Sequence, residues 1–364
     1  MNLFSFIYSF AIFISFLTGL ILTELCRSVA IQLNILDHPQ GRKSHIEPTP
    51  LLGGVGIFAS FHISLFIIFL LYLFSKDFRE ALPGSSIIDF LGAGSFQKVL
   101  GIVGGSVVIF ILGLIDDIKS LRPGIKLAGQ ILASLILVFS GIRIEMFYFS
   151  HWLLSSLITI AWIVLLTNSL NLLDNMDGLC AGISFISAIA FFLCIQPYDE
   201  FLIRLFLMIF AGSVAGFLFH NINPARIFMG DAGSMFCGFF LSTIGVLGTF
   251  HLEGTPSRVA ILAPVVILSV PLFDTFSVIY LRWRSGQPIM LGDKRHFSHR
   301  LVELGMTSKQ AVEFIWLVGI ITCIGALFLP MLNFNFSVLI ILQILGIYIL
   351  IVLLMNAQKN TNGK

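Results

Sequence analysis

Three groups of aspartates stand at the ends of apolar stretches in this sequence. They are the adjacent pair Asp116 and Asp117, the pair Asp174 and Asp177 in NSLNLLDNMDG (168–178), and Asp231 in GDAGS (230–234). A carboxylate at the end of an apolar helix is costly unless a cation pairs with it. One such pair alone is most simply a solvated helix end, but three groups favour a bound divalent metal. Oxygen ligands suit Mg²⁺ or Mn²⁺, and Mg²⁺ sites commonly include substrate phosphates, so these residues indicate phosphate chemistry.

The glycines around Asp231 allow two interpretations. Glycine and aspartate favour ordinary turns, and a turn is needed before the next apolar stretch. Alternatively, a glycine-flanked aspartate that enters a helix can hold a metal while the N–H groups of the helix start bind a phosphate. Both interpretations stay open on this motif alone.

Cationic side chains accompany the aspartates. Lys126 could bind a phosphate, or it could extend its charge from a span boundary to the membrane surface. A second group of cationic side chains lies at the end of the segment 282–300. Its candidate ligand-binding residues are Arg295, His296, His299 and Arg300. Histidines three residues apart share one face of a helix and can bind zinc, but no further Cys or His converges on them. A clamp for a diphosphate is therefore the better interpretation.

The elements that must position these residues are membrane spans. Of the 364 residues, 57% are hydrophobic and 11% are charged, and the mean hydropathy of +0.99 is too high for a water-soluble globule. Apolar runs recur that predict an all-α integral membrane protein with about eleven transmembrane helices in a single domain, 1–364. The expected spans are 2–23, 51–75, 99–115, 125–142, 152–170, 179–198, 203–220, 234–252, 257–280, 313–332 and 336–356. The first span is expected to be retained, because the first six residues have no Lys or Arg.

The distribution of Lys and Arg predicts the orientation of these spans. If the amino terminus lies outside, fifteen of the 21 Lys and Arg residues fall on the cytoplasmic side, as the positive-inside rule requires. The carboxyl terminus then lies inside as well. The polar loops share this cytoplasmic face, and they cover 37–54, 116–126, 168–178, 223–234 and 282–300. The net charge of +2 is too small to indicate nucleic acid binding.

Taken in order, these loops resemble the polyprenyl-phosphate N-acetylhexosamine-1-phosphate transferase family, whose members start lipid intermediates of O-antigen, teichoic acid and peptidoglycan. The similarity runs from about Asp37 to Thr307. It rests on DHPQGRKSHIEPTPLLGG (37–54), the Asp116–Asp117 pair, NSLNLLDNMDGL (168–179), PARIFMGDAGS (224–234), PLFDT (271–275) and HFSHRL (296–301). The last motif is closer to enzymes that use UDP-N-acetylglucosamine or a related amino sugar than to the muramyl-pentapeptide branch. Ser298 departs from the H-x-H-H form of many relatives.

The resemblance implies a role for each candidate residue. Asn171 and Asp231 would bind Mg²⁺ with Asp117 nearby, and Lys126 would contact the diphosphate. The uracil site would include Asp177 and Phe228, and Asp174 is expected to contact substrate beside it. The sugar phosphate would face Arg295, His296, His299 and Arg300. Asp116 resembles the residue often proposed as the base for the lipid phosphate, and the catalytic set is therefore Asp116, Asp117 and Asp231.

The expected reaction is attack by an oxygen of undecaprenyl phosphate on the sugar-linked phosphorus of a UDP-N-acetylhexosamine, most simply UDP-GlcNAc, with release of UMP. The enzyme would act in the inner membrane, and membrane lipid and a second copy of the chain are included among the expected partners. Asp116 could act as a base, position the phosphate, tune the metal or form an aspartyl phosphate. The rival class is a transporter of lipid-linked or nucleotide sugars, but transporters usually bind substrate near the midplane. A third alternative is a non-catalytic membrane scaffold, in which the crowded acidic loops would be costly without purpose.

Overall fold

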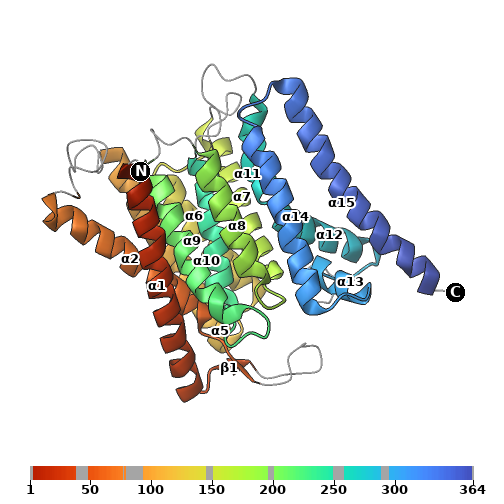
Figure 1. Ribbon diagram of the computed structural model, residues 1–364, viewed down its shortest axis with the longest axis horizontal. Coiled ribbons are helices and arrows are strands. Elements are labelled where there is room, and N and C mark those ends of the chain that lie inside the picture. Colours follow the sequence, from red (N-terminus) through yellow and green to blue (C-terminus); the bar gives the residue numbers. More distant parts are fainter. Residues whose placement is uncertain are drawn as a thin grey trace.

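The computed structural model describes residues 3–37, 48–76, 78, 93–144, 151–195, 201–248, 258–287 and 295–362. Within these ranges the chain is a bundle of helices with one small two-stranded sheet (Figure 1). The helices are α1 (Leu3–Gln32), α2 (Gly53–Phe74), α5 (Ala93–Lys119), α6 (Pro123–Phe139), α7 (Trp152–Leu173), α8 (Leu179–Cys194), α9 (Phe201–Asn221), α10 (Gly230–Leu247), the 3-10 helix η1 (Arg258–Leu262), α11 (Ala263–Ile267), α12 (Ser269–Arg284), α13 (Phe297–Glu303), α14 (Ser308–Phe328) and α15 (Phe334–Asn362). The strands β1 (Leu36–Asp37) and β2 (Thr49–Pro50) pair antiparallel.

The predicted all-α membrane protein is confirmed. Among the described residues, 8 helices are long and apolar enough to cross a membrane, or up to 9 if one bent pair forms a single span. Two predicted spans correspond to shorter apolar helices, α6 with 17 residues and α8 with 16. The count of about eleven spans therefore stays a prediction, although every predicted range overlaps a helix.

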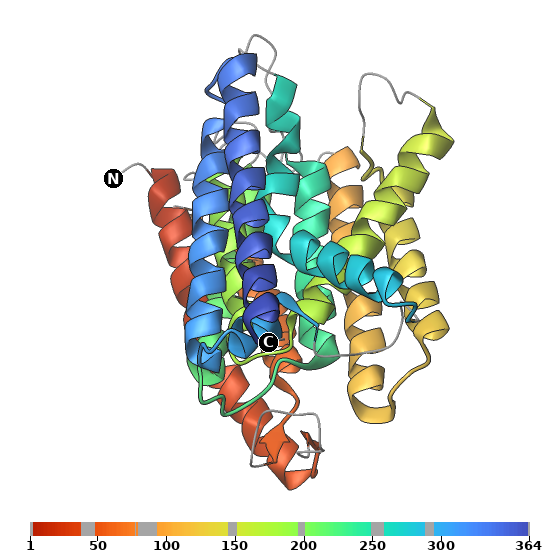
Figure 2. The same cartoon turned by 90° about the vertical axis from the view of Figure 1, so that its right-hand side faces the viewer.

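The predicted span 257–280 differs from a straight helix. Val259–Ile267 and Ser269–Arg284 meet at an angle of 71°, and Figure 2 shows α12 running across the bundle. Pro271 lies near the bend and has no N–H to donate to the carbonyl of Ile267 four residues earlier. That carbonyl instead accepts a weak hydrogen bond from the thiol of Cys323 on α14, at 3.8 Å. The bend carries α12 toward α13 and the segment that precedes it.

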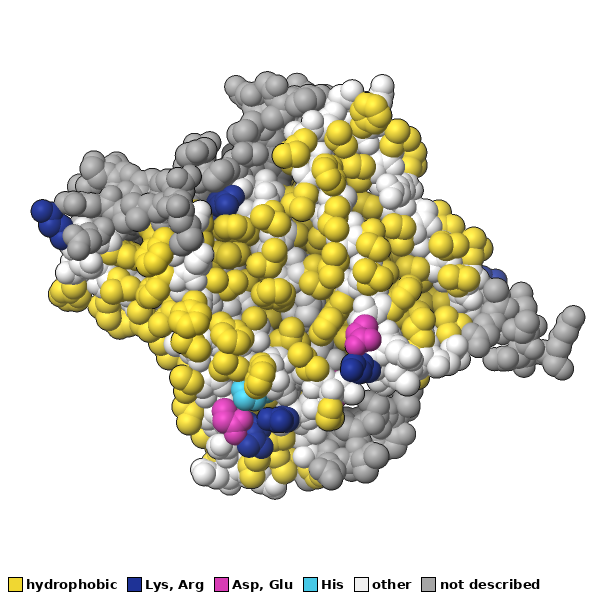
Figure 3. Space-filling view, in the orientation of Figure 1, with side chains coloured by type: hydrophobic (Ala, Val, Ile, Leu, Met, Phe, Trp, Pro, Cys, Tyr) yellow, Lys and Arg dark blue, Asp and Glu magenta, His cyan; other side chains and the backbone are white. Residues whose placement is uncertain are grey.

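Helix α10 lies at the centre of the bundle and packs against α2, α5, α7 and α8. In its most apolar window 72% of the residues are buried, compared with 22% in α15 at the periphery. Stacked aromatic rings fill the space around it, including Phe210 and Phe240 with ring centroids 4.4 Å apart. Hydrophobic side chains cover most of the outer face in Figure 3, as a surface in contact with lipid requires. A rigid central helix thus fixes the position of the GDAGS motif at its start.

The described parts of the polar loops meet at one end of the bundle, the lower end in Figure 1. The loop after β2 lies along the loop before α10, because the N–H of Phe228 donates to Pro50 (2.8 Å) and the N–H of Gly54 donates to Met229 (2.8 Å). The amino terminus lies at the opposite end, and α15 runs back toward the end that holds α13 (Figures 1 and 2). The relative placement agrees with the predicted topology, whereas the side that faces the cytoplasm stays a prediction.

The orientation can be tested with the two ends of one helix. We expect a cysteine at Lys98, near the start of α5, to react with an impermeant maleimide in intact cells, because the amino-terminal end is predicted to lie outside. A cysteine at Ser120, just after the same helix, should react only after the membrane is opened. Both positions are exposed in the structure. In a background without the five natural cysteines, labelling of the Ser120 position from outside would reverse the predicted topology.

Candidate active site

Four aspartates gather where α5 and α7 end and α10 begins. This acidic cluster consists of Asp116 and Asp117 on α5, Asp174 directly after α7, and Asp231 in the first turn of α10. The turns that end α5 and α7 place these side chains at the same depth, because each helix leaves its apolar span at that point. The structure therefore brings together carboxylates that are more than a hundred positions apart in the sequence.

Lys126, in the first turns of α6, lies inside the acidic cluster. Its ammonium group contacts the carboxylates of both Asp116 and Asp231, and the distance from Nζ to Oδ2 of Asp231 is 2.6 Å. Asn171 on α7 holds the other oxygen of Asp231, since its Nδ2 donates to Oδ1 at 2.9 Å. The same amide donates to the hydroxyl of Ser234 at 3.0 Å. Five polar side chains from α5, α6, α7 and α10 thus form one connected network.

Asp117 has a structural task within this network. Its carboxylate accepts the N–H groups of Asp231 (2.7 Å) and Ala232 (3.1 Å), which are unpaired donors at the start of α10. Gly230 makes this approach possible: its φ is +70°, and a Cβ at this position would lie 2.6 Å from an oxygen of Asp117. Asp117 therefore caps the helix that presents Asp231, whether or not it also binds a metal.

The charge of the acidic cluster is incompletely balanced by the described side chains. Lys126 contributes one positive charge in direct contact, against four carboxylates. Burial, followed by repulsion from the negative charge of Asp231, raises the pKa of Asp174 well above its usual value. A cation bound among these oxygens would relieve the repulsion.

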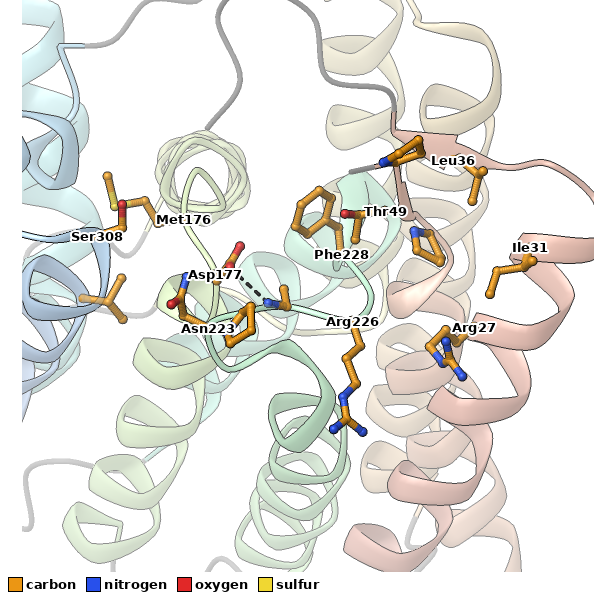
Figure 4. A pocket seen from close by; sticks show the side chains of 15 residues that line it. Arg27, Ile31, Leu36, Thr49, Met176, Asp177, Asn223, Arg226, Phe228 and Ser308 are labelled. Carbon is orange, nitrogen blue, oxygen red and sulfur yellow. Dashed lines mark hydrogen bonds between the residues drawn. The ribbon is translucent and has the colours of Figure 1, made fainter. Parts of the chain in front are cut away.

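A cavity of about 920 Å³ is lined in part by residues that lie close in sequence to Asp174 and Asp231, and Figure 4 shows its lining. Asp177 and Phe228, the two residues expected at a uracil site, both line it. The carboxylate of Asp177 is fixed in place, because Oδ2 accepts from Nδ2 of Asn223 (2.9 Å) and from the N–H of Ala225 (3.1 Å). The guanidinium groups of Arg27 and Arg226 lie toward the α1 side of the same cavity (Figure 4).

The third part of the site is α13 with the residues just before it. His296 is 5% exposed, and its ring lies 6.5 Å from the ring of His299. Arg300 donates to the hydroxyl of Ser277 (2.7 Å), and Arg295 donates to the hydroxyl of Ser285 (2.6 Å), so both guanidinium groups contact α12 or the residue after it. None of these four candidate residues is among those that line the cavity.

Ser298 connects α13 to the rest of the site. Its hydroxyl donates to Oδ1 of Asn175 at 2.5 Å, in the short turn that also carries Asp174 and Asp177. Ser298 is the residue at which this sequence departs from the H-x-H-H form. Ser298 is only 1% exposed, so its hydroxyl needs a partner within the protein, and Asn175 provides it.

Comparison with known proteins identifies the family. Residues 99–249, which span the acidic cluster from α5 to α10, match the family described as glycosyl transferase family 4. The chain is 31% identical over 341 residues to the probable undecaprenyl-phosphate N-acetylglucosaminyl 1-phosphate transferase of Bacillus subtilis, covering 91% of this chain and 87% of that protein. The chain belongs to the polyprenyl-phosphate sugar-1-phosphate transferase family.

Other members of the family are similar over most of their length. This chain is 30% identical to the decaprenyl-phosphate N-acetylglucosaminephosphotransferase of Mycolicibacterium smegmatis, over 82% of this chain and 76% of that protein. It is 27% identical to the undecaprenyl-phosphate alpha-N-acetylglucosaminyl 1-phosphate transferase of Escherichia coli O157:H7, over 83% and 78% of the two chains. The resemblance inferred from the polar loops is confirmed, and the transporter alternative finds no support.

Several polar residues of the transferase site were not singled out by sequence reasoning. Arg27, Arg226 and Asn223 line the cavity or hold Asp177, and their motifs gave no sign of these contacts. Asp274 was noted only as part of PLFDT, yet a carboxylate inside an apolar span is itself a signal of function. The structure shows it fully buried beside His296.

Proposed function

We propose that the transferase moves N-acetylglucosamine 1-phosphate from UDP-GlcNAc to undecaprenyl phosphate and releases UMP. The observation that carries this proposal is the cavity next to the acidic cluster. Asp177 in its wall is three residues from Asp174, and Phe228 is three residues from Asp231. A nucleotide bound in the cavity would therefore have its phosphates within reach of the carboxylates, of Lys126 and of a metal.

The cavity offers the chemistry that a uracil ring needs. The aromatic ring of Phe228 provides a face for stacking, and such contacts between bases and aromatic rings are worth about 1–3 kcal/mol. Asp177 is an acceptor for the ring N–H, and its orientation is fixed by Asn223 and Ala225. Arg226 lies at the α1 side of the same space, together with Arg27, whose guanidinium group pairs with Glu24 at 2.7 Å. A nucleoside diphosphate would offer its base to Phe228 and Asp177 and its negative charge to the arginine side of the cavity.

The acidic cluster fits Mg²⁺. In the part of the chain that the structure describes, no three His, Cys, Asp or Glu side chains form a ready-made closed metal site. Mg²⁺ does not require one, because it usually takes one or two carboxylates and completes its shell with water and substrate phosphates. The residues that would hold it are Asp231 and Asn171, with Asp117 adjacent. The metal would neutralise the diphosphate while Lys126 shares that task.

The amide of Asn171 would have to turn for this role. Its nitrogen now faces Asp231, and the oxygen is the atom that a metal takes. A half-turn of the amide exchanges the two atoms with little change in shape. A bound cation would attract the amide oxygen of Asn171 and would therefore favour the turned orientation.

The chemical step needs positioning more than proton transfer. A phosphate monoester is largely a dianion at neutral pH, because its second pKa is about 6. Both oxygens of Asp116 are engaged, one by Lys126 and the other by the N–H of Leu121. We therefore assign Asp116 the task of placing Lys126 and the lipid phosphate, in preference to the base and aspartyl-phosphate alternatives. The inner membrane supplies the lipid, and the site at one end of the bundle lets the second substrate enter from the cytoplasm.

The direct test is an assay of UMP release with purified transferase, undecaprenyl phosphate and a panel of UDP-sugars. We expect UDP-GlcNAc to be the preferred donor and activity to require Mg²⁺ or Mn²⁺, because otherwise the carboxylates and the diphosphate repel one another. Chelation with EDTA should abolish transfer, and added Mg²⁺ should restore it. Full transfer by metal-free enzyme would refute the metal assignment, and release of UMP from another UDP-sugar alone would refute the donor assignment.

A further inference from the structure

Asp274 is a buried carboxylate that the reaction described so far does not use. It lies on α12 and has 0% exposure. A buried charge is costly unless it is paired and hydrogen-bonded. Its two partners belong to the start of α13: Oδ2 lies 2.8 Å from Nδ1 of His296, and Oδ1 accepts the N–H of Phe297 at 2.6 Å. One carboxylate thus holds both the imidazole ring and the backbone at the point where α13 begins.

These two contacts fix the chemistry of the imidazole ring. An ionised carboxylate only accepts hydrogen bonds, so Nδ1 of His296 must carry a proton. The other ring nitrogen, Nε2, is then the atom that remains for a ligand. Because the N–H of Phe297 occupies the second oxygen of Asp274, the carboxylate cannot rotate without breaking that bond.

The next turn of both helices repeats the contact. Ser277, three residues after Asp274, accepts a hydrogen bond from Arg300, which follows His296 by four residues. Arg295 also donates to the carbonyl of Leu281 on α12 (3.4 Å), so three of the four residues expected at the sugar phosphate contact α12. The bend of 71° before α12 is what brings this helix against α13.

We propose that Asp274 is a positioning residue, which orients His296, keeps a proton on Nδ1 and stabilises the ring with a second proton on Nε2, so that the Nε2–H group donates to the sugar phosphate of the donor. The proposal rests on the proposed function, together with the expectation from the family resemblance that His296 faces the sugar phosphate. It goes beyond the function by assigning a task to the PLFDT motif. A purely structural pair would use the same hydrogen bonds, and the experiment must separate these two roles.

The variant Asp274→Asn separates them through the ring tautomer. The carbonyl oxygen of the new amide can accept from the N–H of Phe297, and its NH₂ group then faces Nδ1 of His296. That nitrogen must become an acceptor, so the ring carries a proton on Nε2 alone and loses the positive charge that strengthens its contact with a phosphate. We expect kcat/KM for the donor to fall about 100-fold, the loss that a misplaced catalytic contact produces. The matched control is Thr275→Val, because Thr275 is also buried on α12 and its hydroxyl has no hydrogen-bond partner among the described residues.

A double variant tests whether Asp274 acts through His296. If it does, Asp274→Asn combined with His296→Gln should be no slower than His296→Gln alone. If the losses multiply instead, Asp274 acts independently of His296 and the proposal is wrong. Melting temperatures of all variants in detergent show whether a loss of activity comes from unfolding.

Nitrogen NMR of histidine-labelled protein gives a readout that does not depend on activity. The signals of His296, identified by their loss in His296→Gln, should report a protonated Nδ1 in the wild type and an unprotonated Nδ1 in Asp274→Asn. An unprotonated Nδ1 in the wild type would overturn the proposal even if Asp274→Asn does not fold. If the wild type transfers no sugar phosphate from any UDP-sugar, the proposed function fails, while the NMR result still decides whether Asp274 sets the tautomer.

Discussion

Replacement of Asp231 by Asn is expected to abolish sugar-phosphate transfer while leaving the transferase folded. The new side chain keeps its size and can still accept the hydrogen bond from Asn171 through its oxygen. It loses the negative charge that Lys126 and a metal both use. Lys126 retains its contact with Asp116, so the fold of the cluster should survive. Mutation of a residue that only hydrogen-bonds to a metal ligand commonly lowers metal affinity or activity about 10- to 100-fold. Loss of the ligand itself should lower activity further.

The measurement is the rate of UMP release over a magnesium titration, together with gel filtration and thermal melting. Asparagine still offers one neutral oxygen, so a partial return of activity at high Mg²⁺ would agree with weakened metal binding. The control is Glu313→Gln on α14, an exposed carboxylate whose described ion pair is with Lys309, at 3.9 Å. Wild-type turnover by Asp231→Asn at limiting Mg²⁺ would mean that Asp231 is only a residue of the turn.

Much of this arrangement could be predicted from the sequence, because the bilayer limits where polar groups can lie. Apolar runs of the right length fix the depth at which each helix ends. Asp116 and Asp174 lie where such runs end, and Asp231 lies where one begins. The predicted topology therefore places all three at the same end of the bundle. Lys126 was assigned to the same surface for the same reason. The structure adds that Lys126 contacts both Asp116 and Asp231.

The partners of individual oxygens could not be predicted in this way. Asp117 was read as a residue near the metal, but its contacts with the N–H groups of α10 depend on two helices meeting at Gly230. The contact between Asp274 and His296 depends on the bend before α12, and hydropathy shows the whole segment as one apolar run. Packing between distant segments decides both features, and a single sequence does not encode it in any local pattern.

Replacement of Lys126 by Met is expected to lower transfer about 100- to 1,000-fold, as loss of a preorganised charge near a reacting phosphate does elsewhere. Methionine has a similar length and a similar helix propensity, so α6 should remain intact. The variant removes the positive charge that lies between Asp116 and Asp231 and leaves the two carboxylates to repel each other. The lipid phosphate and the diphosphate would then approach a more negative site.

The variant Lys126→Arg refines this prediction. Arginine keeps the charge but spreads it over a planar group with fixed donor directions, which cannot occupy the position of a compact ammonium between two carboxylates. We therefore expect its activity to fall between those of wild type and Lys126→Met. Kinetics with each substrate in turn will show whether the loss appears in kcat or in the KM for the UDP-sugar.

The control for Lys126 is Lys119→Met, at the exposed end of α5, because it removes a lysine from the same side of the bundle. If Lys126 merely extended its charge to the membrane surface, the two variants would behave alike and both would keep wild-type activity. A large loss confined to Lys126→Met requires a specific electrostatic role. The contacts with Asp116 and Asp231 would then place that role where the two anionic substrates of the proposed reaction meet.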